Sequence, residues 1–288
     1  MRYHNEYPKL GPTFITIGVF DGVHLGHQQL LKTLVHHAHA MGFKAVVFTF
    51  SEHPSHLFDL GHLKPAITTL EHRLHLIESC GVDDILIFDF TKEFAAQTAE
   101  QFLKRLKQSI DVKGLFLGYD GKIGSDRKKS NFTDTELITI PPYSENGHLI
   151  SSSKIRDEIS HGDFKNLPKM LGRPYTLYAP VISGEGRGKK LSIPTLNIDV
   201  KGLQLPPKGV YELRYLKDSV SYKAIGNLGH APTFGKRKLL LEVHLLEVPD
   251  SIDEMAEVEF VRFIRPEKKF NSKEALIEQI KQDIKQVS

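Results

Sequence analysis

The sequence predicts an α/β domain with a doubly wound parallel sheet, followed by a small antiparallel β-barrel and a C-terminal helix. In the first half, apolar strand-like runs alternate with amphipathic helical patterns, which is typical of βαβ units. After about Arg173, short strand-like runs follow one another with only turn residues between them, which favours a small barrel. We therefore expect two domains, residues 1–173 and 174–288, joined near Leu171 to Pro174.

The first predicted strand, residues 13–20, is a continuous apolar and β-branched run, which indicates a strand covered on both faces. The helix that follows stops at Gly42 and has one apolar stripe: Leu30, Leu31, Leu34, Val35, Ala38 and Met41. The other elements expected in this half are strands at 44–50, 83–90, 114–120 and 136–143, and helices at 68–81 and 98–110.

The second half has six strand-like runs and ends in a helical pattern. The runs are residues 176–184, 195–200, 209–216, 221–229, 239–248 and 256–265. In the closing helix, Asn271 and Glu274 form a cap pattern, and the apolar stripe is Leu276, Ile277, Ile280 and Ile284.

Composition limits the class of protein. Hydrophobic residues make up 40% and charged residues 25% of the 288-residue chain, as in ordinary soluble proteins. A net charge of +3 is too mild to indicate nucleic-acid binding but suits anionic small molecules. Cys80 is the only cysteine, which excludes an intramolecular disulfide and a cysteine zinc site, and we interpret it as a small buried residue. No apolar run is long enough to span a bilayer, so we expect a cytoplasmic protein.

The string GVFDGVHLGH, residues 18–27, runs from the carboxyl end of the first predicted strand into the start of the first predicted helix. The start of a helix offers unpaired backbone N–H groups and the positive end of the helix dipole, which together attract anions. Gly22 and Gly26 would let a phosphate approach the main chain, and His24 and His27 would donate hydrogen bonds to it. Two histidines at this spacing are more often surface or capping residues, so the bare pattern leaves a purely structural turn open.

The wider string TIGVFDGVHLGHQQLL resembles the nucleotide-binding signature of bacterial FAD synthetases (riboflavin kinase/FMN adenylyltransferase), members of the Rossmann-like HxGH nucleotidyltransferase superfamily. FTFSEHP and LISSSKIRDEISHGDFKNLPKMLGRPY are similar to later motifs of the same adenylyltransferase half. GEGRGKKLSIPTLNI, KGVYEL, NLGHAPTFG and LEVHLLE resemble the riboflavin kinase module in the same order. The resemblance therefore covers nearly the whole chain.

For the first half, the resemblance implies transfer of AMP from ATP to the phosphate of FMN, giving FAD and pyrophosphate. It implies that His24, His27 and Arg156 are catalytic and contact the phosphates of ATP. The other ATP-binding residues would be Gly18, Phe20, Asp21, Gly22, Gly26, Ser151, Ser152 and Lys154. The flavin-binding residues would be Phe50, His53, Pro54 and Asp120. For Asp21 we favour a structural role in the turn over metal ligation.

For the second half, the resemblance implies phosphorylation of riboflavin to FMN. Glu242 would be the general base, although a glutamate in a barrel strand is more often an outward-facing polar residue. Thr195 and Asn197 would contact Mg²⁺ bound to ATP, and Gly184, Arg187 and Gly188 would belong to an ATP-binding flap. The expected cofactor is Mg²⁺. The expected partners are the small molecules ATP, FMN, FAD and riboflavin, with no nucleic acid and no membrane, and the oligomeric state stays open.

The chain departs from the family pattern at several positions. After Asp120, Gly121 and Lys122 replace bulky residues; Ser192 and Ile193 replace a glycine and an aromatic residue; Ala231 replaces an arginine; and residues 251–255 stand where a DLYG string is usual. Most of these changes fall in the kinase-like half, so we expect FMN-to-FAD conversion to exceed riboflavin-to-FMN conversion. The alternatives are a monofunctional FMN adenylyltransferase with an inactive kinase-like module, or a non-catalytic flavin-sensing protein.

Overall fold

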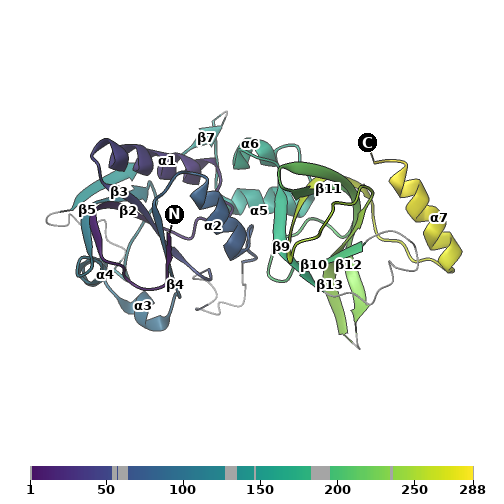
Figure 1. Cartoon of the computed structure of the whole chain (residues 1–288), viewed down its shortest axis with the longest axis horizontal. Helices are drawn as coiled ribbons and strands as arrows, with labels where there is room; N and C mark the ends of the chain where they lie inside the picture. The colour runs from purple at the N-terminus through teal and green to yellow at the C-terminus, as the bar shows by residue number, and fades with distance from the viewer. Residues whose placement is uncertain are drawn as a thin grey trace. The chain divides into compact units, whose positions relative to one another are not determined.

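The computed structural model describes residues 2–53, 57, 64–126, 135–145, 147–182, 195–233 and 236–287 (Figure 1). Pro54, Gly184, Arg187, Gly188, Ser192 and Ile193 lie outside these ranges. The chain divides into two compact units: unit 1 is Met1–Ala66 with Leu70–Ser152, and unit 2 is Ile67–Thr69 with Ser153–Ser288. A functional boundary near residue 173 stays a prediction.

Unit 1 is built on a six-stranded sheet with the strand order β1-β4-β3-β2-β5-β6. Every pair of neighbouring strands is parallel. The strands are β1 (Arg2–His4), β2 (Leu10–Ile17), β3 (Lys44–Phe50), β4 (Asp84–Phe88), β5 (Ile110–Gly118) and β6 (Glu136–Ile140). The helices are α1 (Leu25–Ala40), α2 (Leu70–Glu78), α3 (Lys92–Ala96) and α4 (Ala99–Leu106), and a short hairpin of β7 (Ser144–Glu145) and β8 (His148–Leu149) follows.

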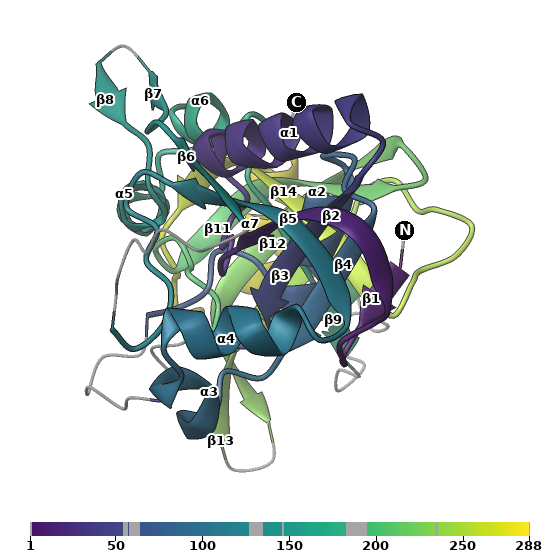
Figure 2. The same ribbon diagram turned by 90° about the vertical axis from the view of Figure 1, so that its left-hand side faces the viewer.

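Helices cover both faces of this sheet. Helix α1 lies across one face and α4 across the other (Figure 2). Leu31 and Leu34 of α1 belong to a buried cluster that includes Phe14, while Phe102 and Leu103 of α4 belong to a second cluster with other strand residues. This double cover explains why the strand sequences are nearly continuously apolar, and it confirms the predicted doubly wound sheet.

The order of the strands places a topological switch point between β2 and β5. From β2 the chain adds β3 and then β4 on one side, whereas β5 and β6 lie on the other side. In open parallel sheets, ligands bind beyond the carboxyl ends of the strands at such a point. The turn that opens α1 follows β2, so it lies at this place in the sheet.

Two details of the first βα unit were predicted wrongly. The strand ends at Ile17 rather than at residue 20, because Phe20 has a φ of 54°, which an extended strand does not permit. Met41 is 52% exposed, since the helix ends at Ala40 and Met41 already belongs to the following turn. Strand β1 is an addition that the sequence pattern did not indicate.

Unit 2 contains a closed antiparallel barrel with the strand order β10-β13-β12-β11-β14-β9, which confirms the predicted barrel. Its strands are β9 (Thr176–Ile182), β10 (Thr195–Asp199), β11 (Gly209–Lys217), β12 (Val220–Thr233), β13 (Lys236–Leu245) and β14 (Met255–Arg265). Leu196, Ile198 and Val243 are buried, as expected for strand residues that face the barrel interior. The helices are α5 (Ser152–His161), α6 (Leu167–Leu171) and α7 (Lys273–Ile284).

Helix α7 differs from its prediction in its cap and at one residue of its apolar stripe, while Ile277, Ile280 and Ile284 of that stripe are half-buried. The cap is Ser272, whose hydroxyl accepts a hydrogen bond from the Ala275 amide, rather than Asn271. Leu276, expected in the buried stripe, is 36% exposed. The buried residue is instead Asp283, which is 1% exposed and accepts a 2.7 Å hydrogen bond from Arg265 Nη2. An ion pair therefore anchors this helix to the last barrel strand.

Candidate active site

The turn between β2 and α1 has an unusual backbone. Phe20 and Val23 have φ values of 54° and 36°, and Gly22 lies between them with a φ of 78°. A positive φ is rare for a β-branched residue such as Val23, and such strain persists only where the surrounding structure enforces it. Both strained side chains are buried, with Phe20 4% and Val23 1% exposed. The core therefore holds the turn in a conformation that delivers the next residue, His24, to the start of α1.

His24 caps helix α1. Its backbone is extended, and its Nδ1 accepts a 3.3 Å hydrogen bond from the backbone N–H of His27. A ring nitrogen that accepts a hydrogen bond carries no proton, so the proton of the neutral His24 ring is on Nε2. Gly26 makes room for this ring, because a Cβ at position 26 would lie 3.2 Å from two of its atoms. A larger residue at position 26 would therefore press against the His24 ring.

His27 stacks on His24, with ring centroids 3.7 Å apart and an interplanar angle of 17°. The Phe20 ring lies edge-on to His27, with centroids 5.3 Å apart. Burial, and secondarily the charge of His24, hold the pKa of His27 well below its usual value, so its ring is neutral near pH 7. Its Nδ1 is buried and has no hydrogen-bond partner within the described part of the chain. A buried polar atom without a partner at a helix N-terminus is a position where a ligand is expected.

A hydrogen bond joins the second predicted phosphate motif to this turn. Ser152 Oγ donates a 3.0 Å hydrogen bond to the carbonyl of Asp21, across 131 residues of sequence. Asp21 itself is only 4% exposed, in keeping with a structural role in the turn. Ser151 and Ser152 lie at the start of α5, whereas Lys154 and Arg156 belong to unit 2, and the placement of those two residues toward the histidines stays a prediction.

Arg73, which the sequence analysis missed, lies at the carboxyl end of β3 and interacts with the turn that contains Asp21. It lies on α2, is 4% exposed, and its Nη2 donates hydrogen bonds to the carbonyls of Phe50 and Ser51 at the end of β3. Burial lowers its pKa, while the charges of Asp21 and Glu71 oppose that shift. Arg73 therefore links the carboxyl end of β3 electrostatically to the turn that contains Asp21. A buried arginine in a helix of mixed polarity has no distinctive sequence signal.

The predicted flavin residues follow two strands of the sheet. Phe50 ends β3, is 5% exposed, and packs edge-on against Phe90 at a centroid distance of 5.0 Å. Asp120 is exposed in the turn after β5. In that turn the Gly121 amide donates a 2.9 Å hydrogen bond to the Gly118 carbonyl, and a Cβ at position 121 would lie 3.0 Å from that oxygen. The tight turn accounts for a glycine where the family has a bulky residue.

The barrel brings the predicted kinase residues together. On the paired strands β10 and β13, Asn197 lies opposite Glu242 and Thr195 lies opposite His244. These residues occupy alternate positions, so they share the face opposite to the buried interior positions. Thr195 Oγ1 lies 2.8 Å from His244 Nδ1, and burial lowers the pKa of His244. The sequence analysis missed His244, although it stands two residues after Glu242 in the same strand.

The replaced segment at 251–255 has a structural role of its own. Lys217 Nζ donates hydrogen bonds to the Ser251 carbonyl at 3.1 Å, to Ser251 Oγ at 2.8 Å and to Asp253 Oδ1 at 2.8 Å. The segment is thus tied to the end of β11. Ala231 lies in β12, opposite Lys238 of β13.

Comparison with known proteins decides the family. A family model described as FAD synthetase matches residues 7–154. This chain belongs to the FAD synthetase family. A second model, described as riboflavin kinase, matches residues 171–288. The bifunctional riboflavin kinase/FMN adenylyltransferase of Haemophilus influenzae is 33% identical over 98% of this chain and 95% of its own. The enzyme of that name from Bacillus subtilis is 32% identical over 93% of this chain and 89% of its own.

A solved structure agrees with this membership at the level of fold. A crystal structure described as a macrolide-efflux protein from Streptococcus pneumoniae is 28% identical and covers 98% of this chain and 97% of its own, with a TM-score of 0.82. In this FAD synthetase family member, no helix in the described ranges is long and apolar enough to cross a membrane. The described residues also hold no group of three or more His, Cys, Asp or Glu side chains arranged for a metal ion.

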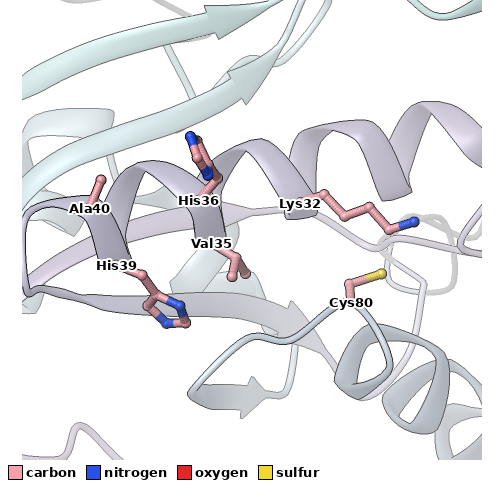
Figure 3. A pocket seen from close by; sticks show the side chains of 6 residues that line it. All are labelled: Lys32, Val35, His36, His39, Ala40 and Cys80. Carbon is pink, nitrogen blue, oxygen red and sulfur yellow. The ribbon is translucent and has the colours of Figure 1, made fainter.

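A surface pocket of about 370 Å³ lies beside α1 of this family member, at residues that come later in the helix than His27 (Figure 3). It is lined by the α1 residues Lys32, Val35, His36, His39 and Ala40, together with Cys80. His39 Nε2 lies 2.9 Å from Asp83 Oδ2, and Cys80 Sγ donates to the Leu76 carbonyl. Cys80 is 8% exposed, which confirms its interpretation as a small buried residue.

Proposed function

We propose that this chain makes FAD by AMP transfer at the HxGH turn of unit 1, which is the turn between β2 and α1 that ends in His24 and His27. An oxygen of the FMN phosphate attacks the α-phosphorus of ATP, a new P–O bond forms, and the bond to the leaving pyrophosphate breaks. The observation that carries the proposal is the stacked histidine pair at the N-terminus of α1, with a buried His27 nitrogen that has no partner in the described chain. Membership in the FAD synthetase family supports the same reaction.

The chemistry assigned to the two histidines is electrostatic. His24, with its proton on Nε2, would donate to a phosphate oxygen, and neutral His27 would offer a second ring N–H. Negative charge develops on the oxygens around the α-phosphorus as the attacking FMN oxygen approaches on the side opposite to the leaving pyrophosphate. Fixed donors and the positive helix end stabilise that charge more than they stabilise bound ATP, which accelerates the reaction.

The remaining unit 1 assignments stay proposals. Ser151 and Ser152 would add hydroxyl donors, and Lys154 and Arg156 would bind the β- and γ-phosphates. The flavin would lie near Phe50, His53, Pro54 and Asp120. We also propose a cytoplasmic location.

For unit 2 we propose riboflavin phosphorylation. The terminal ribityl hydroxyl oxygen attacks the γ-phosphorus of ATP, ADP leaves, and Glu242 accepts the hydroxyl proton. Residues Thr195 and Asn197 place two oxygen-bearing side chains on the face they share with Glu242, which fits the preference of Mg²⁺ for oxygen ligands. The ion would neutralise phosphate charge when bound with ATP. A chelator should therefore abolish riboflavin phosphorylation, and added Mg²⁺ should restore it; phosphorylation that persists in excess chelator would contradict the metal assignment.

Chromatography of flavin products tests the proposed function. The purified chain is incubated with ATP and Mg²⁺ and with either riboflavin or FMN. AMP transfer requires FAD to appear from FMN in step with pyrophosphate. A protein that binds flavin tightly but yields no FAD and no pyrophosphate would instead match the flavin-sensing alternative.

A further inference from the structure

The contact between Thr195 and His244 in the barrel plays no part in the reactions proposed above. The two residues are direct partners on β10 and β13, and Thr195 Oγ1 lies 2.8 Å from His244 Nδ1. Two positions along the same strands, Asn197 is the partner of Glu242. Because side chains alternate along a strand, the four residues form two neighbouring rows on one face.

The chemistry of the threonine hydroxyl gives this contact a consequence. A hydroxyl oxygen has two lone pairs and one proton, and it binds a cation through a lone pair with its proton directed away. The proton then needs an acceptor, and His244 Nδ1 lies at hydrogen-bond distance from the oxygen. Asn197, whose amide oxygen carries no proton, has no such requirement.

We propose that His244 is a positioning residue for cation binding in unit 2. Its Nδ1 accepts a hydrogen bond from the Thr195 hydroxyl, which turns the lone pairs of Thr195 Oγ1 toward the cation that accompanies the nucleotide. The inference rests on the proposed kinase reaction of unit 2. It extends that reaction to a residue beside Thr195 that would itself contact neither cation nor nucleotide. If the Thr195–His244 pair only stabilised the sheet, removing the His244 acceptor would leave the affinity for the cation unchanged.

The test measures Mn²⁺ binding to the full chain in the presence of ADP, by electron paramagnetic resonance of free Mn²⁺. Thr195→Val defines the binding class that depends on the hydroxyl. His244→Phe keeps a ring but removes the acceptor. It should weaken that Mn²⁺-binding class by about 10-fold, as the loss of a residue that orients a metal ligand typically does. His244→Gln supplies a side-chain oxygen acceptor and should recover most of the affinity. Circular dichroism and thermal unfolding of all three variants, compared with the wild type, check that the barrel of unit 2 still folds.

The double variant His244→Phe with Thr195→Val separates positioning from a general loss of structure. If His244 acts through Thr195, the double variant should bind Mn²⁺ as Thr195→Val alone does. Losses that simply add would overturn the inference, as would wild-type Mn²⁺ affinity in His244→Phe. If Thr195→Val itself binds Mn²⁺ normally, the assignment of Thr195 to the cation fails instead, and the inference fails with it.

Discussion

His27 lies with one ring face against His24 and with Phe20 edge-on to it, and its Nδ1 is buried without a partner in the described chain. Leaving a buried polar atom unpaired costs roughly 1–3 kcal/mol. A protein tolerates that cost most readily where a ligand completes the hydrogen bond. The phosphates of ATP would do so at the N-terminus of α1.

Replacing either histidine with alanine should lower FAD formation from FMN by about 100-fold, since the loss of one preorganised donor to transition-state charge typically has this size. The ATP dissociation constant should change much less, because the interaction strengthens only during the reaction. His36→Ala is the matched control, an exposed histidine on the same helix. Near-wild-type FAD formation in both active-site variants would remove the histidines from the mechanism.

The lowered pKa of His27 predicts a pH dependence of stability. The unfolded chain binds a proton at this histidine near pH 6.5, whereas the folded chain resists binding it until a lower pH. Neutral, buried His27 therefore contributes to the free energy of unfolding above the pKa of the unfolded chain, and this contribution is lost as the pH falls toward the pKa of the folded chain. Chemical denaturation at pH 7.5 and 5.5 should show a smaller loss of stability in His27→Gln than in the wild type, with His36→Gln as control. Equal losses in His27→Gln and the wild type would contradict the burial argument.

At the scale of elements, the order of strand-like and helical runs and the spacing of apolar residues within them predicted the sheet, its helices and the barrel. That spacing reflects which faces are buried. The end of β2 was misplaced because Phe20 is apolar but sits in a left-handed conformation, which tertiary packing imposes and composition does not reveal. The burial of Asp283 in α7 was missed for a similar reason: this carboxylate pairs with Arg265 of another element. Arg73 and His244 were missed because their roles depend on partners distant in sequence.

Gly26→Ala tests the packing at the start of α1. A Cβ at that position would lie 3.2 Å from the His24 ring and should displace it, lowering FAD formation by about 10-fold for a small misplacement of a catalytic group. Alanine is also the better helix former, so thermal stability should not fall in parallel. Gly11→Ala is the control, since nothing lies within 4 Å of a Cβ there. Equal FAD formation in the two variants would show that the ring position is not critical.

At the scale of the whole molecule, the chain combines two compact units, with an AMP-transfer site proposed in the first and a phosphoryl-transfer site in the second. The order of motifs along the sequence predicted this combination, and the matches to the FAD synthetase and riboflavin kinase models follow the same order. The sequence could not show how the strands align Thr195 and Asn197 with His244 and Glu242, because that register depends on the closed barrel. Nor does it fix the position of Arg156 relative to the histidines.

The most direct measurement of the central claim is a flavin time course with riboflavin, ATP and Mg²⁺ for the wild type, His27→Ala and Glu242→Gln. The wild type should form FAD, with FMN adenylylation faster than riboflavin phosphorylation. His27→Ala should accumulate FMN and almost no FAD, whereas Glu242→Gln should leave riboflavin unconverted yet still turn supplied FMN into FAD. If His27→Ala formed FAD at the wild-type rate, or if Glu242→Gln could no longer convert FMN to FAD, the assignment of AMP transfer to the HxGH turn of unit 1 would be contradicted.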